Sequence, residues 1–377
     1  MGKRVVVLGA GFGGLELATM LSEALGEDAG VTLIDKSDAF VFGFAKLDVM
    51  FGRSTGGEIR LPYAAIAKPG VTVLRETVTA IDPETKVVTT DAGTHEADVL
   101  VVALGADYDI DATPGLAEGA TEFYSVAGAE RLASVVSEIA EGHIVIGVCG
   151  APFKCPPAPS ECALLLDDEL TRRGVRDACR ISFVMPLGTP VPPSPETSKA
   201  LEAEFAARGI EFLGGRRIAS LDATSRTVAL EDGGELSYDL FLAVPKHRAP
   251  DVVIESGMTE DGYIAVDFAT LQTRWPGVYA LGDVATAGVP KAGVFAEGAA
   301  RVVAQAILAE LHGGEAPSRH LGQGTCYIEF GHGRIGSVDI DFLSGPEKTG
   351  TFNAPSAEQM ALKENFGSTR RARWFGA

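Results

Sequence analysis

The pattern of apolar residues at the start of the chain predicts a strand, a helix and a second strand. Residues 3–8 are mostly β-branched and apolar, as expected of a strand buried on both faces of a parallel sheet. A glycine-rich turn from Gly9 to Gly14 follows, and residues 15–21 then carry apolar side chains at helical spacing. Residues 31–35 form a second apolar run that ends on an acid. This order predicts a strand–turn–helix–strand unit.

The same alternation returns in the middle of the chain. Residues 143–147 and 181–185 predict two further strands, and residues 161–173 and 198–208 predict the helices that follow them. A second α/β unit is therefore expected here, as though the first had been duplicated.

Shorter β-rich segments lie between these landmarks. We expect residues 85–90 to pair with 97–102, and residues 227–230 to pair with 236–242, as cross-connections between the units.

The C-terminal region predicts a small separate element, with two β-like stretches at residues 326–330 and 333–341 and then a tail. The fold class is therefore α/β, with two Rossmann-like dinucleotide-binding domains and a small C-terminal domain. The predicted boundaries are residues 1–110 and 245–315 for the discontinuous first domain, 111–244 for the second, and 316–377 for the C-terminal region.

The glycine-rich turn follows the GxGxxG spacing of dinucleotide sites. Gly9 allows the tight turn, Gly11 lets the backbone approach a pyrophosphate, and Gly14 lets the helix pack close to the strand. Asp35 lies where an acid accepts hydrogen bonds from ribose hydroxyls. A glycine-rich turn without a ligand is the alternative, but the complete order of parts favours a dinucleotide.

Two later segments extend this site. Residues 98–106 predict a buried strand that ends in small residues suited to lie against a cofactor. Residues 277–285 predict a strand that runs into Gly282 and Asp283, followed by a helical pattern over 293–311. The aspartate can bind a sugar-like hydroxyl, and the N-terminus of the helix can face a flavin ring.

These motifs resemble the flavoprotein fold that glutathione reductase and type II NADH dehydrogenase share, in which the distant aspartate binds the ribityl chain of FAD. The resemblance implies FAD as the cofactor and a divided binding site. The residues that it implies are Gly9, Gly11, Gly14, Asp35, Lys36, Val78, Gly105, Gly282, Asp283, Lys291, Gly293 and Val294.

The second unit lacks the usual phosphate turn. Residues 148–159 contain four prolines, a phenylalanine and two cysteines where glycines and free N–H groups would be needed. Proline removes a donor and restricts φ, so this loop is a poor phosphate cradle. The strand that should end on a ribose-binding acid ends instead at Met185 and Pro186. NAD(P)H is therefore disfavoured as a ligand.

The loop Pro152-Phe153-Lys154-Cys155-Pro156-Pro157-Ala158-Pro159 resembles the cysteine loop of the sulfide:quinone oxidoreductases and of the related flavocytochrome c sulfide dehydrogenase flavoproteins. Similarity to that family extends over nearly the whole chain. The other segments that carry it are Tyr238-Asp239-Leu240, residues 244–250, Pro290-Lys291-Ala292-Gly293-Val294-Phe295-Ala296-Glu297 and Arg373-Trp374-Phe375-Gly376.

The resemblance implies that Cys155 and Cys326 form a redox-active pair beside the flavin. Cys149 and Cys162 stay open as alternative partners, and Cys179 is expected to be a small buried hydrophobe. Lys154 and a nearby helix N-terminus are expected to favour the Cys155 thiolate.

The implied reaction oxidises sulfide, or a small thiol or persulfide, to polysulfide or sulfur and passes the electrons through FAD to a quinone. Lys291 and the N-terminus near Gly293 would stabilise the reduced flavin. Glu161 would relay protons or simply be an acid in the first turn of a helix.

Other residues receive weaker expectations. Phe295, Phe330 and the basic, aromatic C-terminal tail would line the quinone route or touch lipid headgroups, with packing onto the domain as the alternative for the tail. His247 is expected to be a hydrogen-bonding loop residue. The chain departs from many members of the family in having no cysteine between residues 2 and 148.

Three other functions are compatible with parts of this sequence. A type II NADH:quinone oxidoreductase shares the fold, but the proline-rich loop opposes it. A reductase of the glutathione reductase kind needs two cysteines after the second strand, and residues 36–60 contain none. A non-catalytic FAD-binding sensor is expected to keep the FAD motifs while its cysteines lie apart.

Composition and charge restrict the partners and the cellular location that are expected. The net charge of −19 argues against nucleic acid as a partner and favours a very soluble or salt-adapted surface. Five cysteines at irregular spacing do not form a disulfide framework, and no metal site is expected. The expected location is the cytoplasm, with peripheral contact at the inner face of the cell membrane and a homodimer as open alternatives.

Overall fold

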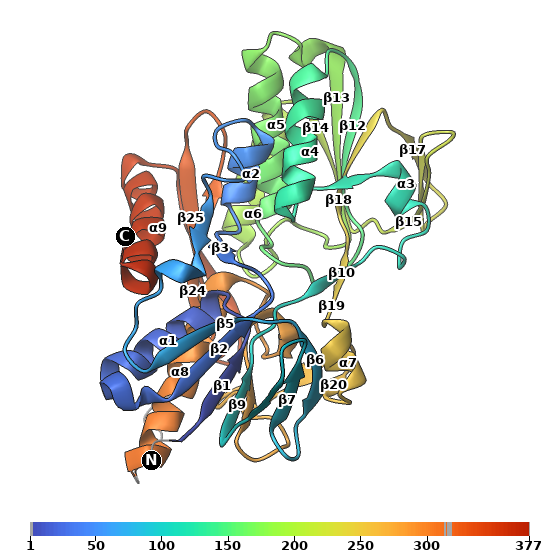
Figure 1. Cartoon of the computed structure of the whole chain (residues 1–377). Coiled ribbons are helices and arrows are strands. Elements are labelled where there is room, and N and C mark those ends of the chain that lie inside the picture. Colours follow the sequence, from blue (N-terminus) through green and yellow to red (C-terminus); the bar gives the residue numbers. More distant parts are fainter. Residues whose placement is uncertain (1–2, 313, 315–318, 377) are drawn as a thin grey trace.

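The computed structural model describes residues 3–312, 314 and 319–376. Its first domain is built on a five-stranded sheet, in the order β22-β9-β1-β2-β5, in which every neighbouring pair is parallel (Figure 1). The strands are β1 (Val5–Leu8), β2 (Val31–Asp35), β5 (Val71–Arg75), β9 (Val99–Val102) and β22 (Val278–Ala280). All residues of β1 and β9 are buried, because helices and loops cover both faces.

Helices α1 (Phe12–Leu25) and α8 (Gly293–His312) pack against each other in this domain (Figure 1). Helix α1 begins directly after the glycine-rich turn, and α8 begins shortly after β22, so both N-termini lie at the carboxyl edge of the sheet. That edge is where ligands bind in open parallel sheets.

Smaller elements complete the first domain. They are η1 (Gly26–Ala29), β3 (Ala39–Val41), α2 (Ala45–Met50), β4 (Arg60–Pro62), η2 (Tyr63–Ala65), the antiparallel sheet β6 (Val78–Asp82), β7 (Val87–Thr90) and β8 (Thr94–Glu96), then α7 (Asp251–Glu255), β20 (Thr259–Glu260), β21 (Tyr263–Ala265), η4 (Gly282–Val284) and β23 (Ala285–Thr286).

The second domain contains a second parallel five-stranded sheet, in the order β11-β18-β12-β13-β14. Its elements are α3 (Leu116–Gly119), β11 (Thr121–Glu122), α4 (Val126–Glu138), β12 (Gly142–Val148), α5 (Ala158–Arg172), η3 (Arg176–Ala178), β13 (Cys179–Met185), α6 (Pro195–Ala207), β14 (Ile210–Gly214), β15 (Ile218–Asp222), β16 (Thr227–Leu230), β17 (Glu235–Ser237) and β18 (Leu240–Val244). Two parallel sheets confirm the predicted α/β fold with two Rossmann-like cores.

The two crossings between these domains run side by side. Strands β10 (Asp107–Asp109) and β19 (Lys246–Arg248) pair antiparallel, one leading away from the first sheet and the other returning to it (Figure 1). The two connections between the domains therefore form a two-stranded, hydrogen-bonded ribbon.

The C-terminal region is an antiparallel sheet covered by a helix. Strands β24 (Gln323–Glu329), β25 (Ile335–Asp341) and β26 (Thr349–Asn353) form the sheet, and α9 (Ala357–Phe375) packs on β25. The third strand and the helix were not predicted. The predicted boundary at residue 316 lies outside the described residues.

Two predicted strand pairings are wrong. Strand β7 pairs with β6 and β8, while β9 joins the parallel sheet between β1 and β22. Likewise β16 pairs with β15 and β17, while β18 joins the second parallel sheet. The reason is burial on both faces, since an apolar run such as Val99–Val102 suits the interior of a parallel sheet and not an exposed meander.

The last turns of the C-terminal tail pack onto the first domain, which was one of the expectations for the tail. Trp374 is fully buried, and its indole N–H donates to Glu16 Oε2 of α1 at 2.9 Å. Arg373 pairs with Glu16 and Arg370 with Glu297 of α8, at 2.9 and 2.8 Å. The basic residues of the tail thus neutralise buried acids. Among the described residues, no helix is both long and apolar enough to cross a membrane.

Candidate active site

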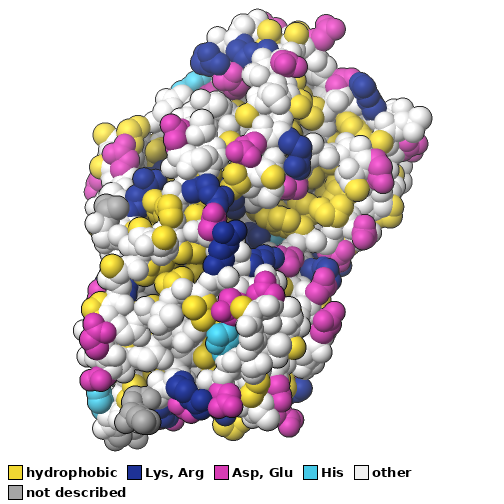
Figure 2. Space-filling view, in the orientation of Figure 1, with side chains coloured by type: hydrophobic (Ala, Val, Ile, Leu, Met, Phe, Trp, Pro, Cys, Tyr) yellow, Lys and Arg dark blue, Asp and Glu magenta, His cyan; other side chains and the backbone are white. Residues whose placement is uncertain are grey.

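A cavity of about 730 Å³ runs along the carboxyl edge of the first sheet and ends between the three parts of the molecule. It lies within the range of about 300–1,000 Å³ usual for ligand sites. Across the middle of the face in Figure 2, Lys and Arg side chains lie among hydrophobic ones. Both kinds of residue line the cavity, which combines apolar walls with a few charged groups.

The glycine-rich turn forms one wall of the cavity. Gly9 has φ +101°, and a Cβ there would collide with the carbonyl of Ala103. A Cβ at Gly11 would meet nothing within 4 Å, so the backbone is open to a ligand at the position predicted to approach a pyrophosphate. No side chain caps the N-terminus of α1, which leaves its N–H groups available to an anion. Gly14 does not line the cavity. A Cβ there would collide with Gly9, which is the close packing that its position predicts.

Asp35 holds this turn in shape. One of its carboxylate oxygens accepts from the N–H of Ala10 at 2.8 Å, and the other accepts from the N–H of Ser37 at 2.7 Å. Asp35 and Lys36 both line the cavity. Each carboxylate oxygen still has lone pairs for a ribose hydroxyl.

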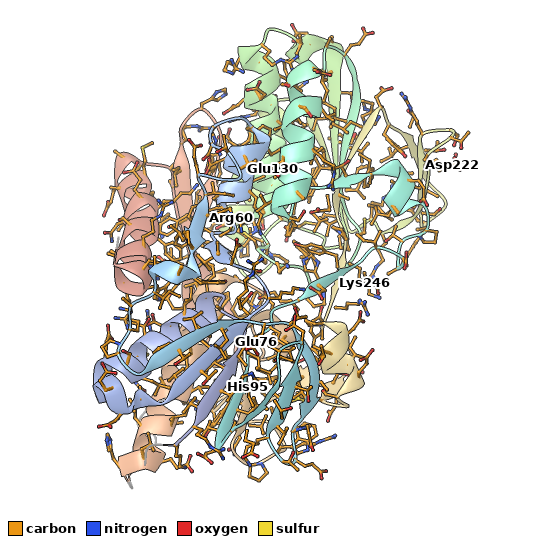
Figure 3. The ribbon with its side chains drawn as sticks, viewed as in Figure 1. Arg60, Glu76, His95, Glu130, Asp222 and Lys246 are labelled. Carbon is orange, nitrogen blue, oxygen red and sulfur yellow. The ribbon has the colours of Figure 1, made fainter. Side chains whose placement is uncertain are left out.

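One end of the cavity is lined by Glu76, Thr77 and Val78, at the start of β6. Glu76 lies beside His95 of β8, with 2.7 Å between the carboxylate and Nε2 (Figure 3). Thr90 also donates to Glu76 at 2.6 Å. Because these two partners hold the pKa of Glu76 below its ordinary value, the carboxylate faces the cavity as an anion.

The later part of the predicted FAD site lines the same cavity as the glycine-rich turn. Gly105, Gly282, Asp283, Gly293 and Val294 all line the cavity. Gly282 has φ +75°, and a Cβ at Gly293 would lie 2.5 Å from the ring of Phe12. Burial raises the pKa of Asp283, and charges of nearby lysines oppose this shift. With the open turn at Gly11 and a sugar-binding carboxylate further along, the donor set fits a dinucleotide.

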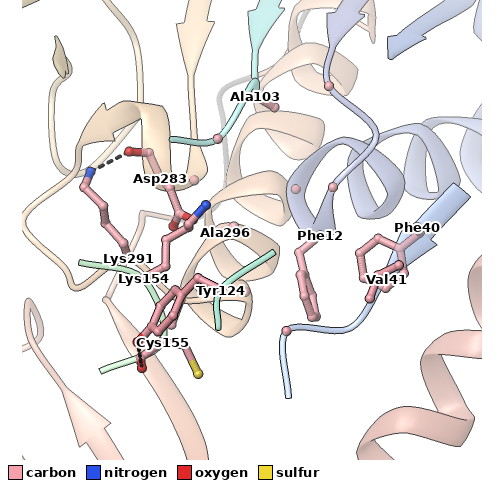
Figure 4. Close-up of a pocket in the computed structure, with 18 of the residues that line it drawn as sticks. Phe12, Phe40, Val41, Ala103, Tyr124, Lys154, Cys155, Asp283, Lys291 and Ala296 are labelled. Atoms are coloured by element: carbon pink, nitrogen blue, oxygen red, sulfur yellow. Dashed lines mark hydrogen bonds between the residues drawn. The ribbon is translucent and has the colours of Figure 1, made fainter. Parts of the chain in front are cut away.

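The loop that carries Cys155 is longer than its counterpart in the first domain. Nine residues, 149–157, separate β12 from α5, whereas three residues, 9–11, separate β1 from α1. The Cys155 backbone has φ +49°. Its N–H donates to the Lys291 carbonyl at 2.8 Å, and its carbonyl accepts from Tyr124 Oη at 3.4 Å (Figure 4). The loop is thereby fastened to the first domain at the cavity wall.

The expectation that Lys154 favours the Cys155 thiolate is wrong. The Lys154 ammonium turns away, donates to the Ala106 carbonyl at 2.8 Å and lies 4.4 Å from the centre of the Tyr108 ring. Burial raises the pKa of the Cys155 thiol and outweighs the N–H group of Ala158, which favours the thiolate.

Lys291 lies at the cavity wall as predicted, but its charge is already engaged. Its ammonium donates to the Asp283 carbonyl and lies 3.4 Å from the centre of the Tyr263 ring (Figure 4). Burial lowers the pKa of Lys291 to about 8, and the Asp283 carboxylate opposes this effect.

Only two of the five cysteines, all of which the structure describes, line this cavity: Cys155 and Cys326. Cys326 lies on β24, so the two thiols come from different parts of the molecule. All five are free thiols. Cys149 packs in the second domain, and Cys162 is fully buried in α5, away from the cavity surface. Burial raises the pKa of Cys326 to about 12.

Glu161 lies in the first turn of α5 and lines the same cavity as these two thiols. It is 3 % exposed, and its carboxylate accepts from the N–H of Glu329 at 3.0 Å. Burial raises its pKa to about 7, and the charge of Lys363 opposes that shift. The ionised carboxylate raises the pKa of both cysteines. Glu161 is thus a first-turn acid and also a group that can exchange protons near neutral pH.

Several residues of the cavity were not predicted. Lys46 of α2 lines it, as do the aromatic residues Phe12, Phe40 and Phe44. Phe366 also lines it, and this residue belongs to the aromatic C-terminal tail for which such a position was expected. The two predicted aromatics are instead core residues: Phe295 is 2 % exposed and packs on Phe342, and Phe330 is 1 % exposed and packs on Phe352. A sequence signal existed only in the cluster of phenylalanines between residues 40 and 51.

His247 is buried on strand β19 rather than in a loop, and its ring makes a hydrogen bond, as expected. Its Nδ1 lies 2.8 Å from the Pro245 carbonyl, and its ring makes edge contacts with Tyr108 and Tyr124. Burial lowers its pKa to about 3, so the ring is neutral.

A sequence model described as pyridine nucleotide-disulphide oxidoreductase matches residues 3–313. The chain therefore belongs to the pyridine nucleotide-disulphide oxidoreductase family and is an oxidoreductase with the fold of those flavoenzymes. Relatives that match over most of this chain include proteins named sulfide:quinone oxidoreductase, whereas proteins named type II NADH:quinone oxidoreductase match over 36% of it.

The mitochondrial sulfide:quinone oxidoreductase of Dictyostelium discoideum is 26% identical over 293 residues, which cover 74% of this chain and 65% of that protein. The Mus musculus protein of the same name is 23% identical over 364 residues, which cover 93% and 80%. The crystal structure of the sulfide:quinone oxidoreductase from Aquifex aeolicus superposes with a TM-score of 0.86 at 23% identity, covering 99% of this chain and 92% of that one. That superposition supports the shared fold.

Proposed function

We propose that this protein oxidises sulfide, or a small thiol or persulfide, through Cys155 and Cys326, and passes the electrons through FAD to a quinone. The observation that carries the proposal is that Cys155 and Cys326, which lie far apart in the sequence, line one cavity together with the dinucleotide-type glycine turn. The names of the similar proteins support the choice of sulfide and quinone.

FAD would be held along the whole cavity. The turn at Gly11 and the N-terminus of α1 would face the pyrophosphate, Asp35 a ribose, and Asp283 the ribityl chain. The N-terminus of α8 and Lys291 would face the flavin ring. When bound there, FAD supplies a two-electron acceptor beside the cysteines.

The cysteines would then act in their oxidised, bridged form. Hydrosulfide attacks one sulfur of a Cys155–Cys326 disulfide, so the old S–S bond breaks and a new one forms. The products are a persulfide on one cysteine and a thiolate on the other. Glu161, with a pKa of about 7, would hold the proton that sulfide releases.

The aromatic wall offers a place for the quinone. Phe12 lies 5.2 Å from Phe40 and 6.4 Å from Phe366 between ring centres, and all three line the cavity. Flat rings of this kind accept another flat ring by stacking. A peripheral contact with the membrane belongs to the same proposal, because quinones dissolve in lipid.

The test is anaerobic stopped-flow absorbance of the oxidised flavin, mixed separately with sulfide and with NADH. We expect fast bleaching by sulfide, abolished in Cys155→Ser and strongly slowed in Cys326→Ser. Cys149→Ser is the matched control, because this thiol lies outside the cavity, and it should behave as the wild type.

A different result would identify a type II NADH:quinone oxidoreductase. In that case NADH bleaches the flavin, sulfide does not, and the cysteine variants react with NADH as the wild type does. The loop of residues 149–157 opposes that outcome. Pro157 is the N-cap of α5 and Pro159 lies in its first turn, so N–H groups that would bind a phosphate are missing there. Inertness toward both donors would favour a non-catalytic FAD-binding protein.

A further inference from the structure

The cationic side chains of the cavity differ in whether their charge is already engaged. Lys154 is bonded to the Ala106 carbonyl, Lys291 to the Asp283 carbonyl, and Lys363 to the Glu329 carboxylate. Each of these three also lies over an aromatic ring. Their ammonium groups are therefore largely satisfied by the protein itself.

Lys46 is different. It is half-buried on α2 and lines the cavity, yet among the described residues its ammonium makes no hydrogen bond or ion pair. Its backbone is held in place, because its N–H donates to the Gly43 carbonyl at 3.4 Å. A half-buried cation without a partner is costly unless an anion joins it.

The Lys46 charge acts on Cys155. Burial is the main cause of the raised pKa of Cys155, and among nearby charged side chains Lys46 is the cation that opposes it. The effect is reciprocal, because an ionised Cys155 favours the charged form of Lys46. The charge of a first-domain side chain thus acts on a thiol of the second domain, and both residues line the same cavity.

We propose that Lys46 is the anchor for the anionic sulfur substrate, binding hydrosulfide, or the thiolate or persulfide anion of a small thiol, as it reaches Cys155. This rests on the proposed function. A single fixed charge in a partly dehydrated cavity raises the local concentration of small anions and orients them toward the sulfur. Binding precedes any change in covalent bonds.

The charge of Lys46 also depends on pH. Burial lowers its pKa to about 8, with Lys154 acting in the same direction and with Cys155, Glu122 and Asp283 acting against it. Because this pKa lies below its ordinary value, the positive charge is present at neutral pH and is lost as the pH rises through about 8.

Alkylation of Cys155 by a charged and a neutral reagent tests the anchor directly. The FAD-loaded protein is reduced, freed of reductant under argon, and treated with iodoacetate or iodoacetamide, and mass spectrometry of the Cys155 peptide gives both rates. Both reagents need the same thiolate, so the ratio of the two rates cancels the thiol pKa and reports the local charge.

We expect Lys46→Gln to lower the iodoacetate-to-iodoacetamide ratio about tenfold, as loss of one steering charge predicts. Lys46→Arg should keep the ratio, and should hold it constant where the wild-type ratio falls above about pH 8. Lys199→Gln is the matched control, because it removes one positive charge from an exposed position outside the cavity, and its ratio should equal that of the wild type.

The sulfide kinetics of the same variants separate this proposal from the proposed function. A higher KM for sulfide with little change in kcat in Lys46→Gln supports the anchor. An unchanged ratio, or a Cys155 closed to both reagents, overturns the anchor even if sulfide still bleaches the flavin. If Lys46→Gln lowers the iodoacetate-to-iodoacetamide ratio but sulfide does not bleach the flavin of the wild type, the anion site at Cys155 stands. The proposed sulfide oxidation is then rejected.

Discussion

At the scale of single residues, the carboxyl group of Glu161 lines the same cavity as Cys155 and Cys326. Burial raises its pKa to about 7, so it is neutral at lower pH and ionised at higher pH. As a base it must be ionised, and its contribution therefore grows as the pH rises through 7. We expect the ratio of wild-type to Glu161→Gln rate constants for flavin reduction by sulfide to rise about tenfold with the ionised fraction, from about 10 at about pH 6 to about 10² at about pH 8.

Stopped-flow absorbance at constant ionic strength measures both rate constants. Sulfide itself ionises in this range, but equally for both proteins, so their ratio removes that contribution. A ratio that does not vary with pH would leave Glu161 as a structural acid that accepts the Glu329 N–H.

At the scale of elements, helix α9 fastens the C-terminus to the cofactor turn. The Trp374 ring makes edge contacts with Phe12 and Phe40, at 5.6 and 5.5 Å between ring centres, and its N–H is bonded to Glu16 of α1. Phe12 belongs to the turn that would hold the pyrophosphate. Loss of the packing of α9 is therefore expected to disturb the shape of the FAD site.

We expect Trp374→Ala to lower the free energy of unfolding by about 3–5 kcal/mol, as deletion of a buried aromatic does, and to speed FAD release. Urea denaturation and flavin fluorescence after dilution measure the two effects. Glu364→Ala, at an exposed position of the same helix, is the control and should change neither. Loss of stability without faster FAD release would show that the helix does not support the cofactor turn.

At the scale of the whole molecule, the net charge of −19 means that acidic side chains outnumber basic ones. Repulsion among them opposes the compact state, and salt screens it over distances of about 10 Å at 0.1 M. We expect the midpoint of thermal unfolding to rise by several degrees between about 0.01 and 1 M potassium chloride. Differential scanning calorimetry measures it, and a falling midpoint would mean that surface ion pairs outweigh the net repulsion.

The local parts of the site follow from short stretches of sequence. Gly9 and Gly11 lie at the turn that their spacing predicts, because φ and close approach are properties of the backbone itself. Asp283 follows β22 as predicted, since a strand end positions the next side chain. The direction of the Lys154 side chain could not be predicted in this way, because it depends on the Ala106 carbonyl and the Tyr108 ring, which come from a distant segment.

The sequence by itself determined the class of fold, the dinucleotide-type turn and the cysteine-bearing loop, because periodicity and steric restriction act over a few neighbouring residues. Only the tertiary structure decided that Cys326 shares a cavity with Cys155 while Cys149 does not, and that Lys46 lines that cavity with its charge unpaired among the described residues. Those relations join β24, α2 and the loop before α5, which come together through the packing of separate domains. Burial, partners and pKa values are set by that packing, and a linear pattern carries no information about which distant groups will supply them.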